Sequence, residues 1–188
     1  MIRILSPDEV QKLFALDLGV RNNTIIQVLY WCGLRVSELT SLTINDVYFG
    51  SEVQRFISIR KENSKTDIAR DVQLHENIKT VLKEYYKWLY TENKNQMLGT
   101  GMPLFFMPCR PDSPITSRQV ERIIKDAGIK AGIPGLHPHI FRHTILTLLS
   151  KKVDLPTVQA FAGHRSLQST QVYMHPSSED INKGVNQL

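Results

Sequence analysis

Apolar residues in this chain are spaced as in a helix over most of its length, and the spacing changes in one region only. Apolar side chains recur every three or four positions in residues 24–32 and 78–89, and again in separate runs from residue 117 onward, which predicts helices. Three shorter stretches alternate or are rich in β-branched and aromatic residues, which predicts strands: residues 47–49, 53–59 and 68–74. The pattern therefore predicts a mainly α fold (α+β) with one small three-stranded antiparallel β-sheet.

Capping residues mark the ends of two predicted helices. Ser6 is followed by Pro7 and Glu9, which is typical of a capping box with proline at the first helical position. Gly33 is a typical helix stop, so a second short helix is expected over residues 36–42. Stretches with many polar residues, glycines or prolines predict loops: residues 91–103 and 108–114.

Length and composition restrict the class of protein. The chain has 188 residues, of which 41% are hydrophobic and 22% charged, as in ordinary globular domains. No repeat or linker divides it, so one domain over residues 1–188 is expected. No apolar run approaches the roughly 18 residues of a membrane span, and the first residues lead into a capped helix rather than a signal-peptide core. We therefore expect a cytoplasmic protein without a membrane partner.

Cysteine content and charge add two expectations. Cys32 and Cys109 are the two cysteines, far apart and without metal-ligand spacing, which fits buried thiols in a reducing compartment. The net charge is +5, so an anionic partner is plausible and nucleic acid is the commonest candidate.

Five of the six histidines lie between His137 and His175. His139 and His143 are four positions apart and would share a helix face, as two metal ligands do. A zinc motif of this kind needs glutamate at position 140, which is Ile140, and no nearby residue supplies a third ligand. Arg142 shares the face of His139, and a guanidinium beside an imidazole favours a phosphate site over a metal site.

Arg35 is a second unusual charge. It follows Gly33 and Leu34 in a tight connection between two apolar helices. Such an arginine either points into a functional site or forms a local ion pair with Glu38, and the local pair is the commoner outcome.

Three segments together resemble the motif blocks of the tyrosine recombinases, the phage integrase family. In chain order they are Gly33-Leu34-Arg35-Val36-Ser37-Glu38-Leu39, then His139-Ile140-Phe141-Arg142-His143-Thr144, then Gly163-His164-Arg165-Ser166 with Thr170-Gln171-Val172-Tyr173. One such pattern alone is weak evidence, but three in the family's order are specific. The resemblance extends from about Ser6 to His175.

The resemblance implies a role for each matching residue. Arg35 and Arg142 resemble the two arginines that bind the scissile phosphate, and His139 resembles a histidine that donates a hydrogen bond or moves a proton. His164 resembles a fourth phosphate-side group, and Tyr173 resembles the nucleophile. The other histidines of this region, His137, His143 and His175, are expected to be caps, packing residues or phosphate-proximal residues outside the catalytic set.

The family also uses a lysine in the turn of the small sheet as the general acid, and two lysines compete for that role. Lys65 is favoured over Lys61 because Lys65-Thr66, followed by Arg70-Asp71-Val72-Gln73-Leu74, resembles the family's Lys-Thr and Arg-x-Val-Pro-Leu elements. Gln73 stands where the family usually has proline, a minor departure.

The implied function is site-specific DNA recombination or integration. Tyr173 would cleave a strand and form a 3′-phosphotyrosyl bond, so that rejoining needs neither metal nor ATP and no cofactor is expected. Double-stranded DNA is the implied partner, with four protomers in the recombining complex and accessory DNA-bending proteins as a further class to consider. The alternatives are a type IB topoisomerase, and a DNA-binding regulator without turnover, which the six filled catalytic positions disfavour.

The resemblance also bears on domain organisation. Residues 1–175 would form the motif-bearing catalytic body, and residues 176–188 a C-terminal tail of the kind exchanged between neighbours. Family members usually carry a separate N-terminal core-binding domain, which is expected to be absent from these 188 residues. The basic residues following position 117 are candidates for contacts to the DNA backbone: Arg118, Arg122, Lys125 and Lys130.

Overall fold

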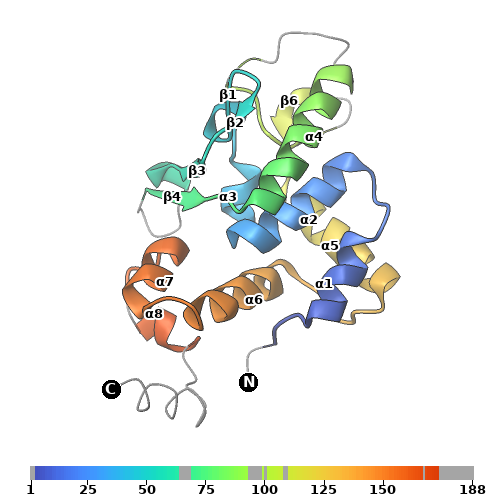
Figure 1. The fold of residues 1–188 in the computed structure, drawn as a ribbon. Helices are drawn as coiled ribbons and strands as arrows, with labels where there is room; N and C mark the ends of the chain where they lie inside the picture. Colours follow the sequence, from blue (N-terminus) through green and yellow to red (C-terminus); the bar gives the residue numbers. More distant parts are fainter. Residues whose placement is uncertain are drawn as a thin grey trace.

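The computed structural model describes residues 3–63, 69–92, 99, 101–107, 110–166 and 168–173. In this part the chain is mostly helical, as Figure 1 shows. The α-helices are α1 (Pro7–Phe14), α2 (Val20–Cys32), α3 (Val36–Thr40), α4 (Glu76–Glu92), α5 (Ser117–Ala131), α6 (Pro138–Ser150), α7 (Leu155–Ala162) and α8 (Gln168–Gln171). Two short 3₁₀ helices are also present: Ile44–Asp46 and Lys61–Asn63.

The predicted fold class is confirmed, but the strands pair differently from the expectation of one three-stranded sheet. The described strands form three separate antiparallel pairs: β1 (Tyr48–Phe49) with β2 (Glu52–Val53), β3 (Phe56–Ile59) with β4 (Arg70–Gln73), and β5 (Phe106–Met107) with β6 (Arg110–Pro114). Gly50 adopts a φ of 60°, which lets the chain turn back immediately after β1. β1 therefore pairs with β2, while β3 pairs with β4.

The β5–β6 hairpin lies where the prolines predicted irregular structure. Pro111 and Pro114 lie within β6, and the register between Phe106 and Met107 is shifted. A two-stranded hairpin tolerates proline because each strand has an unpaired edge that needs no N–H donor. Pro111 and Pro114 are therefore compatible with a strand at this position, and the loop predicted over residues 108–114 is replaced in part by β6.

Local signals correctly predicted where α1 begins and where α2 ends, whereas the helix expected over residues 36–42 ends earlier, at Thr40. The amide of Glu9 donates to Ser6 Oγ over 3.2 Å, and the amide of Ser6 donates to Glu9 Oε2 over 2.8 Å, which completes the capping box of α1. Helix α2 ends at Gly33, whose φ of 59° is left-handed. The following residue, Leu34, is buried, so the chain turns sharply inside the protein to start α3.

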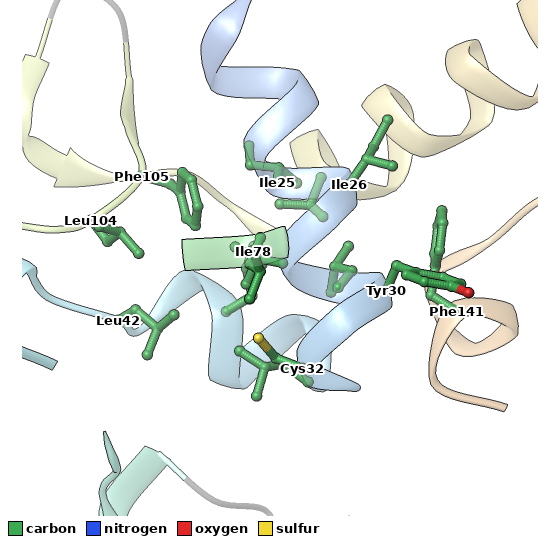
Figure 2. Close-up of a cluster of buried hydrophobic side chains, with 14 of the residues drawn as sticks. Ile25, Ile26, Tyr30, Cys32, Leu42, Ile78, Leu104, Phe105 and Phe141 are labelled. Carbon is green, nitrogen blue, oxygen red and sulfur yellow. The ribbon is translucent and has the colours of Figure 1, made fainter. Parts of the chain in front are cut away.

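Helix α2 lies at the centre of the main core. It packs against α4 and α6, and Figure 2 shows Ile25 and Ile26 of α2 beside Ile78, Phe105 and Phe141 from other segments. All five of these side chains are at most 2% exposed. This packing fixes the position of Gly33 and Arg35 relative to α6.

Cys32 belongs to the same core and is 1% exposed. Burial raises the pKa of its thiol to about 12, so the thiol stays protonated and unreactive at neutral pH. The expectation of a buried thiol is confirmed for Cys32, whereas Cys109 lies outside the described residues.

A second, smaller cluster joins the helices at the C-terminal end of the described chain. Leu146 of α6 and Val158 and Ala162 of α7 surround Tyr173. In Figure 1 these helices, in orange and red, lie beside β3 and β4, and α7 contacts β4. Among the helices of the described chain, none is long and apolar enough to cross a membrane. The tail over residues 176–188 lies outside the described residues.

Candidate active site

Arg142 connects three helices at the centre of the candidate site. It is 4% exposed, and its guanidinium donates to the Gly33 carbonyl and to the Ala162 carbonyl, each over 2.6 Å. Its Nη2 also lies 3.1 Å from His164 Nε2. The predicted site residues on α6 and after α7 are thus brought together at the end of α2.

The charge of Arg142 is held in a strongly cationic environment. Burial lowers the pKa of this guanidinium to about 10, and the positive charges of Arg35 and Arg70 act in the same direction. The residue remains charged at neutral pH. A buried cation beside other cations is expected to bind an anion strongly. The negative charge of the anion offsets both the cost of burying the guanidinium and its repulsion by the neighbouring cations.

Glu38 holds Arg35 in place. Its fully buried carboxylate accepts the Arg35 amide over 2.8 Å and Arg35 Nη1 over 2.9 Å. The ion pair that the sequence offered as one alternative is therefore present, yet Arg35 also acts within the site, because its charge bears on the pKa values of both Arg142 and His164.

Arg70 contributes a third guanidinium to the candidate site. In the sequence, Arg70 stands out only as part of a strand that resembles the family's Arg-x-Val-Pro-Leu element. Its Nη1 and Nη2 donate to the two oxygens of Glu38 over 2.8 and 2.9 Å, and its Nε donates to the Phe161 carbonyl over 3.0 Å. The signal was available in the alternation of Arg70, Val72 and Leu74, which places an arginine on the buried face of β4.

The pKa of Glu38 reflects these contacts. Burial by itself would raise the pKa, but the hydrogen bonds and charges of Arg70 and Arg35 lower it below its ordinary value. Three arginines and one ionised carboxylate leave this cluster with an excess of positive charge. One phosphodiester carries the opposite sign and would partly neutralise that excess.

His164 is neutral in this arrangement. Burial and the charges of Arg142, Arg35 and Arg70 lower its pKa to about 4. Because an arginine only donates, Nε2 accepts from Arg142, which leaves the ring proton on Nδ1 to be donated to Thr170 Oγ1 at 3.0 Å. His164 thus lies within the cluster, while its role as a phosphate ligand stays a prediction.

Tyr173 follows α8 and is 7% exposed. Its ring stacks on that of His164, with centroids 6.2 Å apart and planes 14° apart, and its hydroxyl lies 2.9 Å from His143 Nδ1. Burial raises the pKa of the phenol, and the charges of Arg142 and Arg35 partly oppose this. The predicted nucleophile is therefore protonated at neutral pH and shares one cluster with the arginines.

The two histidines of α6 lie in different environments. His139 is exposed, and its ring centroid is 6.3 Å from that of His143. His143 was expected to lie outside the catalytic set, but the structure brings it against the hydroxyl of Tyr173. Its four-residue spacing from His139 was the available signal, although that spacing by itself suggests a metal ligand. Within the described chain, no three His, Cys, Asp or Glu side chains are grouped as metal ligands would be.

Lys65 lies outside the described residues, as does His175. Lys61 is exposed in the 3₁₀ helix that follows β3. The preference for Lys65 over Lys61 therefore stays a prediction.

Comparison with known proteins identifies the family. The family model described as the phage integrase family matches residues 3–180. The chain belongs to the phage integrase family. Among its relatives, a tyrosine recombinase of Pseudothermotoga lettingae is 32% identical over 187 residues, covering 98% of this chain and 60% of the relative. Tyrosine recombinase XerC of Bacillus pumilus is 33% identical and covers 95% of this chain and 59% of the relative.

Solved structures agree with this membership. The crystal structure of XerA recombinase matches with a TM-score of 0.77 and 31% identity, covering 100% of this chain and 65% of that one. XerH recombinase bound to its difH substrate matches with a TM-score of 0.74 at 24% identity, which speaks to the fold alone. This phage integrase family chain spans about three fifths of the length of the two curated relatives.

Proposed function

We propose that this chain is the catalytic domain of a site-specific DNA recombinase that breaks and rejoins DNA strands through Tyr173. One observation carries the proposal: the hydroxyl-bearing ring of Tyr173 stacks on His164, which itself contacts the buried guanidinium of Arg142. The proposed nucleophile thus lies beside the cationic cluster that is proposed to bind the phosphate. Phosphoryl transfer needs this combination.

In the first step, the guanidinium groups of Arg35 and Arg142 bind the scissile phosphodiester. Attack by the Tyr173 oxygen places additional charge on the nonbridging oxygens, and donors aimed at those oxygens stabilise it. The exposed His139 at the start of α6 is a further donor in the proposal. The described contacts of Arg142 occupy three of its five N–H donors, so others can bind phosphate.

The bond from phosphorus to the 5′ oxygen then breaks, and Lys65 supplies the proton to that oxygen. Tyr173 is left joined to the 3′ phosphate. Attack by a 5′ hydroxyl reverses these steps and releases the tyrosine. Since the phosphotyrosyl bond replaces the broken bond, no cofactor or ATP enters the reaction.

A basic groove supports DNA as the partner. It lies between α5 and the β5–β6 hairpin, has a volume of about 910 Å³, and is lined by several cations: Arg110, Arg118, Arg122 and Lys125. Lys130 is exposed further along α5. Arginines and lysines in such a groove attract the phosphate backbone independently of sequence. XerH and the Tn1549 integrase were solved with DNA, which is consistent with this partner.

Recombination between two sites needs four active centres, so the proposal includes a tetramer assembled on DNA, with residues 176–188 contacting a neighbour. The same proposal includes accessory DNA-bending proteins as partners. It also places the protein in the cytoplasm, associated with DNA. A separate DNA-clamping domain would be supplied outside residues 1–188.

The decisive experiment uses nicked suicide duplexes built from the DNA that flanks the gene, incubated with the chain in EDTA. We expect a denaturant-resistant protein–DNA adduct that Tyr173→Phe abolishes, while Tyr90→Phe, at an exposed position on α4, leaves it unchanged. If no adduct forms on any flanking sequence, the enzyme proposal is wrong and a binding protein without turnover is favoured.

Two further assays refine the assignment. Two-site DNA should give recombinants, whereas a type IB topoisomerase would give relaxed circles only. A substrate with a 5′-bridging phosphorothiolate needs no general acid, so it should restore cleavage to Lys65→Ala. Restoration of Lys61→Ala instead would transfer the role to Lys61.

A further inference from the structure

Helix α6 holds Tyr173 at two points. Ser150 Oγ donates to the Tyr173 carbonyl over 2.9 Å, and His143 Nδ1 lies 2.9 Å from the Tyr173 hydroxyl, seven residues earlier on the same helix. Two turns of one helix therefore fix both the backbone and the hydroxyl of the nucleophile. The ring centroids of His143 and Tyr173 are 5.6 Å apart.

We propose that His143 is the general base that accepts the hydroxyl proton of Tyr173 when the strand is cut. The inference rests on the proposed function and assigns a catalytic role to a residue that the motif comparison left outside the set. The proton passes from Tyr173 Oη to His143 Nδ1 as Oη bonds to phosphorus. The 5′ oxygen leaves with the electron pair of its bond and takes a proton from the general acid. In rejoining, His143 returns its proton to the departing phenolate.

Among the described side chains of the site, two other candidate acceptors, His164 and Glu38, already have partners. Both ring nitrogens of His164 have partners, Arg142 at 3.1 Å and Thr170 at 3.0 Å. The two oxygens of Glu38 are held by Arg35 and Arg70. Arginines have no acceptor. The Nδ1 of His143, in contrast, lies directly against the hydroxyl and can take its proton.

The protonation state of His143 suits this task. Burial lowers its pKa below the ordinary value, and the neighbouring His139, Arg142 and His137 act in the same direction. The imidazole is therefore neutral at neutral pH. With its proton on Nε2, it presents a lone pair on Nδ1 to the hydroxyl. The facing groups are His137 at the N-cap of α6, His139 and Arg142 on α6, and Tyr173 from the segment after α8.

The negative charge of a bound phosphate would offset the nearby cations and make His143 a stronger base. Proton acceptance would then be favoured when substrate is present. The Tyr173 phenol has a raised pKa and is a poor nucleophile until its proton is removed. Proton acceptance by His143 in the presence of substrate would therefore activate Tyr173 when it is needed.

The test measures single-turnover cleavage of the nicked suicide duplex by His143→Gln and His143→Ala. Glutamine can accept the hydrogen bond but not the proton, so we expect at least about a 100-fold loss of cleavage rate with DNA binding retained. Added imidazole should restore part of the rate of His143→Ala. Ser150→Ala, which loosens Tyr173 without removing the base, should be slower but insensitive to imidazole.

The outcomes separate the two proposals. If the wild-type chain forms no adduct, the proposed function itself fails. If the wild type forms the adduct and folded His143→Gln cleaves at a similar rate, or imidazole fails to rescue folded His143→Ala, the general-base role is wrong. Circular dichroism establishes that each variant is folded before its rate is compared.

Discussion

Arg70 and Glu38 form a two-point ion pair that joins strand β4 to the beginning of helix α3. Both N–O distances are below 3.0 Å, at 2.8 and 2.9 Å, and the side chains are 6% and 0% exposed. Because Glu38 also holds Arg35, the orientation of this proposed phosphate-binding residue depends on a strand 32 positions beyond Glu38 in the chain. Arg70 is a positioning residue in this arrangement.

Arg70→Met should be strongly destabilising. It leaves the buried Glu38 carboxylate with Arg35 as its remaining cation, and breaking a buried pair in this way costs about 3–5 kcal/mol. Urea unfolding measures the loss. Arg60→Met is the matched control, because Arg60 pairs with Asp46 at 3.2 Å while 42% exposed and should contribute less than about 1 kcal/mol. Equal losses in the two variants would contradict this role.

Gly163→Ala should cost more stability than Gly132→Ala. Both glycines end helices with left-handed φ values, 62° and 70°, so alanine is strained by about 1–2 kcal/mol at either site. An added Cβ at Gly163 would also lie 2.9 Å from Arg70 Nη1, whereas at Gly132 it meets nothing within 4 Å. We therefore expect Gly163→Ala alone to lower the cleavage rate. Equal thermal midpoints and rates would show that Arg70 moves aside freely.

Thr170→Val should slow cleavage while Thr170→Ser should not. Thr170 is fully buried, and its Oγ1 fixes the proton of His164 on Nδ1. Valine has a similar shape but removes the acceptor, so the ring loses its fixed orientation beside Arg142. Serine keeps the hydroxyl. Comparison of adduct formation by the two variants, with ¹⁵N spectra of the His164 ring, tests this prediction, and similar rates would contradict it.

Stability should fall as the pH is lowered from about 6.5 toward 4. The pKa of His164 is about 4 in the folded chain and about 6.5 in the unfolded chain, so the unfolded chain binds more protons in this window. The free energy of unfolding therefore decreases with decreasing pH and levels off for this group below about pH 4. His143, whose pKa is also lowered, contributes in the same direction. Urea midpoints for His164→Gln should depend less steeply on pH, and an unchanged slope would refute the assignment.

Removing positive charges from the basic groove between α5 and the β5–β6 hairpin should weaken DNA binding in a salt-dependent way. Removal of one cation that neutralises a phosphate reduces the slope of log K against log salt by about 0.9. Arg122→Gln and Lys125→Gln, both lining the groove, should each approach this change in fluorescence anisotropy titrations at several salt concentrations. Lys87→Gln, exposed on α4 outside the groove, is the control. Parallel slopes for all variants would place the DNA elsewhere.

Much of the architecture follows from short-range sequence signals. The Ser6–Glu9 capping box and the Gly33 stop are set by hydrogen bonds and dihedral angles within a few residues, so the sequence predicts them well. The order of the three motif blocks is likewise visible directly in the sequence. The sequence predicts strands within residues 47–74 but not their division into two hairpins, because pairing depends on the Gly50 turn and on which edges remain available.

The helical class, the caps, the family motifs and the identity of the predicted nucleophile all follow from the order of the residues. Two contacts became evident from the folded chain: Arg70 pairs with Glu38, and His143, rather than His164, lies against the hydroxyl of Tyr173. These pairs are 32 and 30 positions apart. Their formation depends on how separately folded helices and strands bury their apolar faces against one another, and no local spacing encodes that packing.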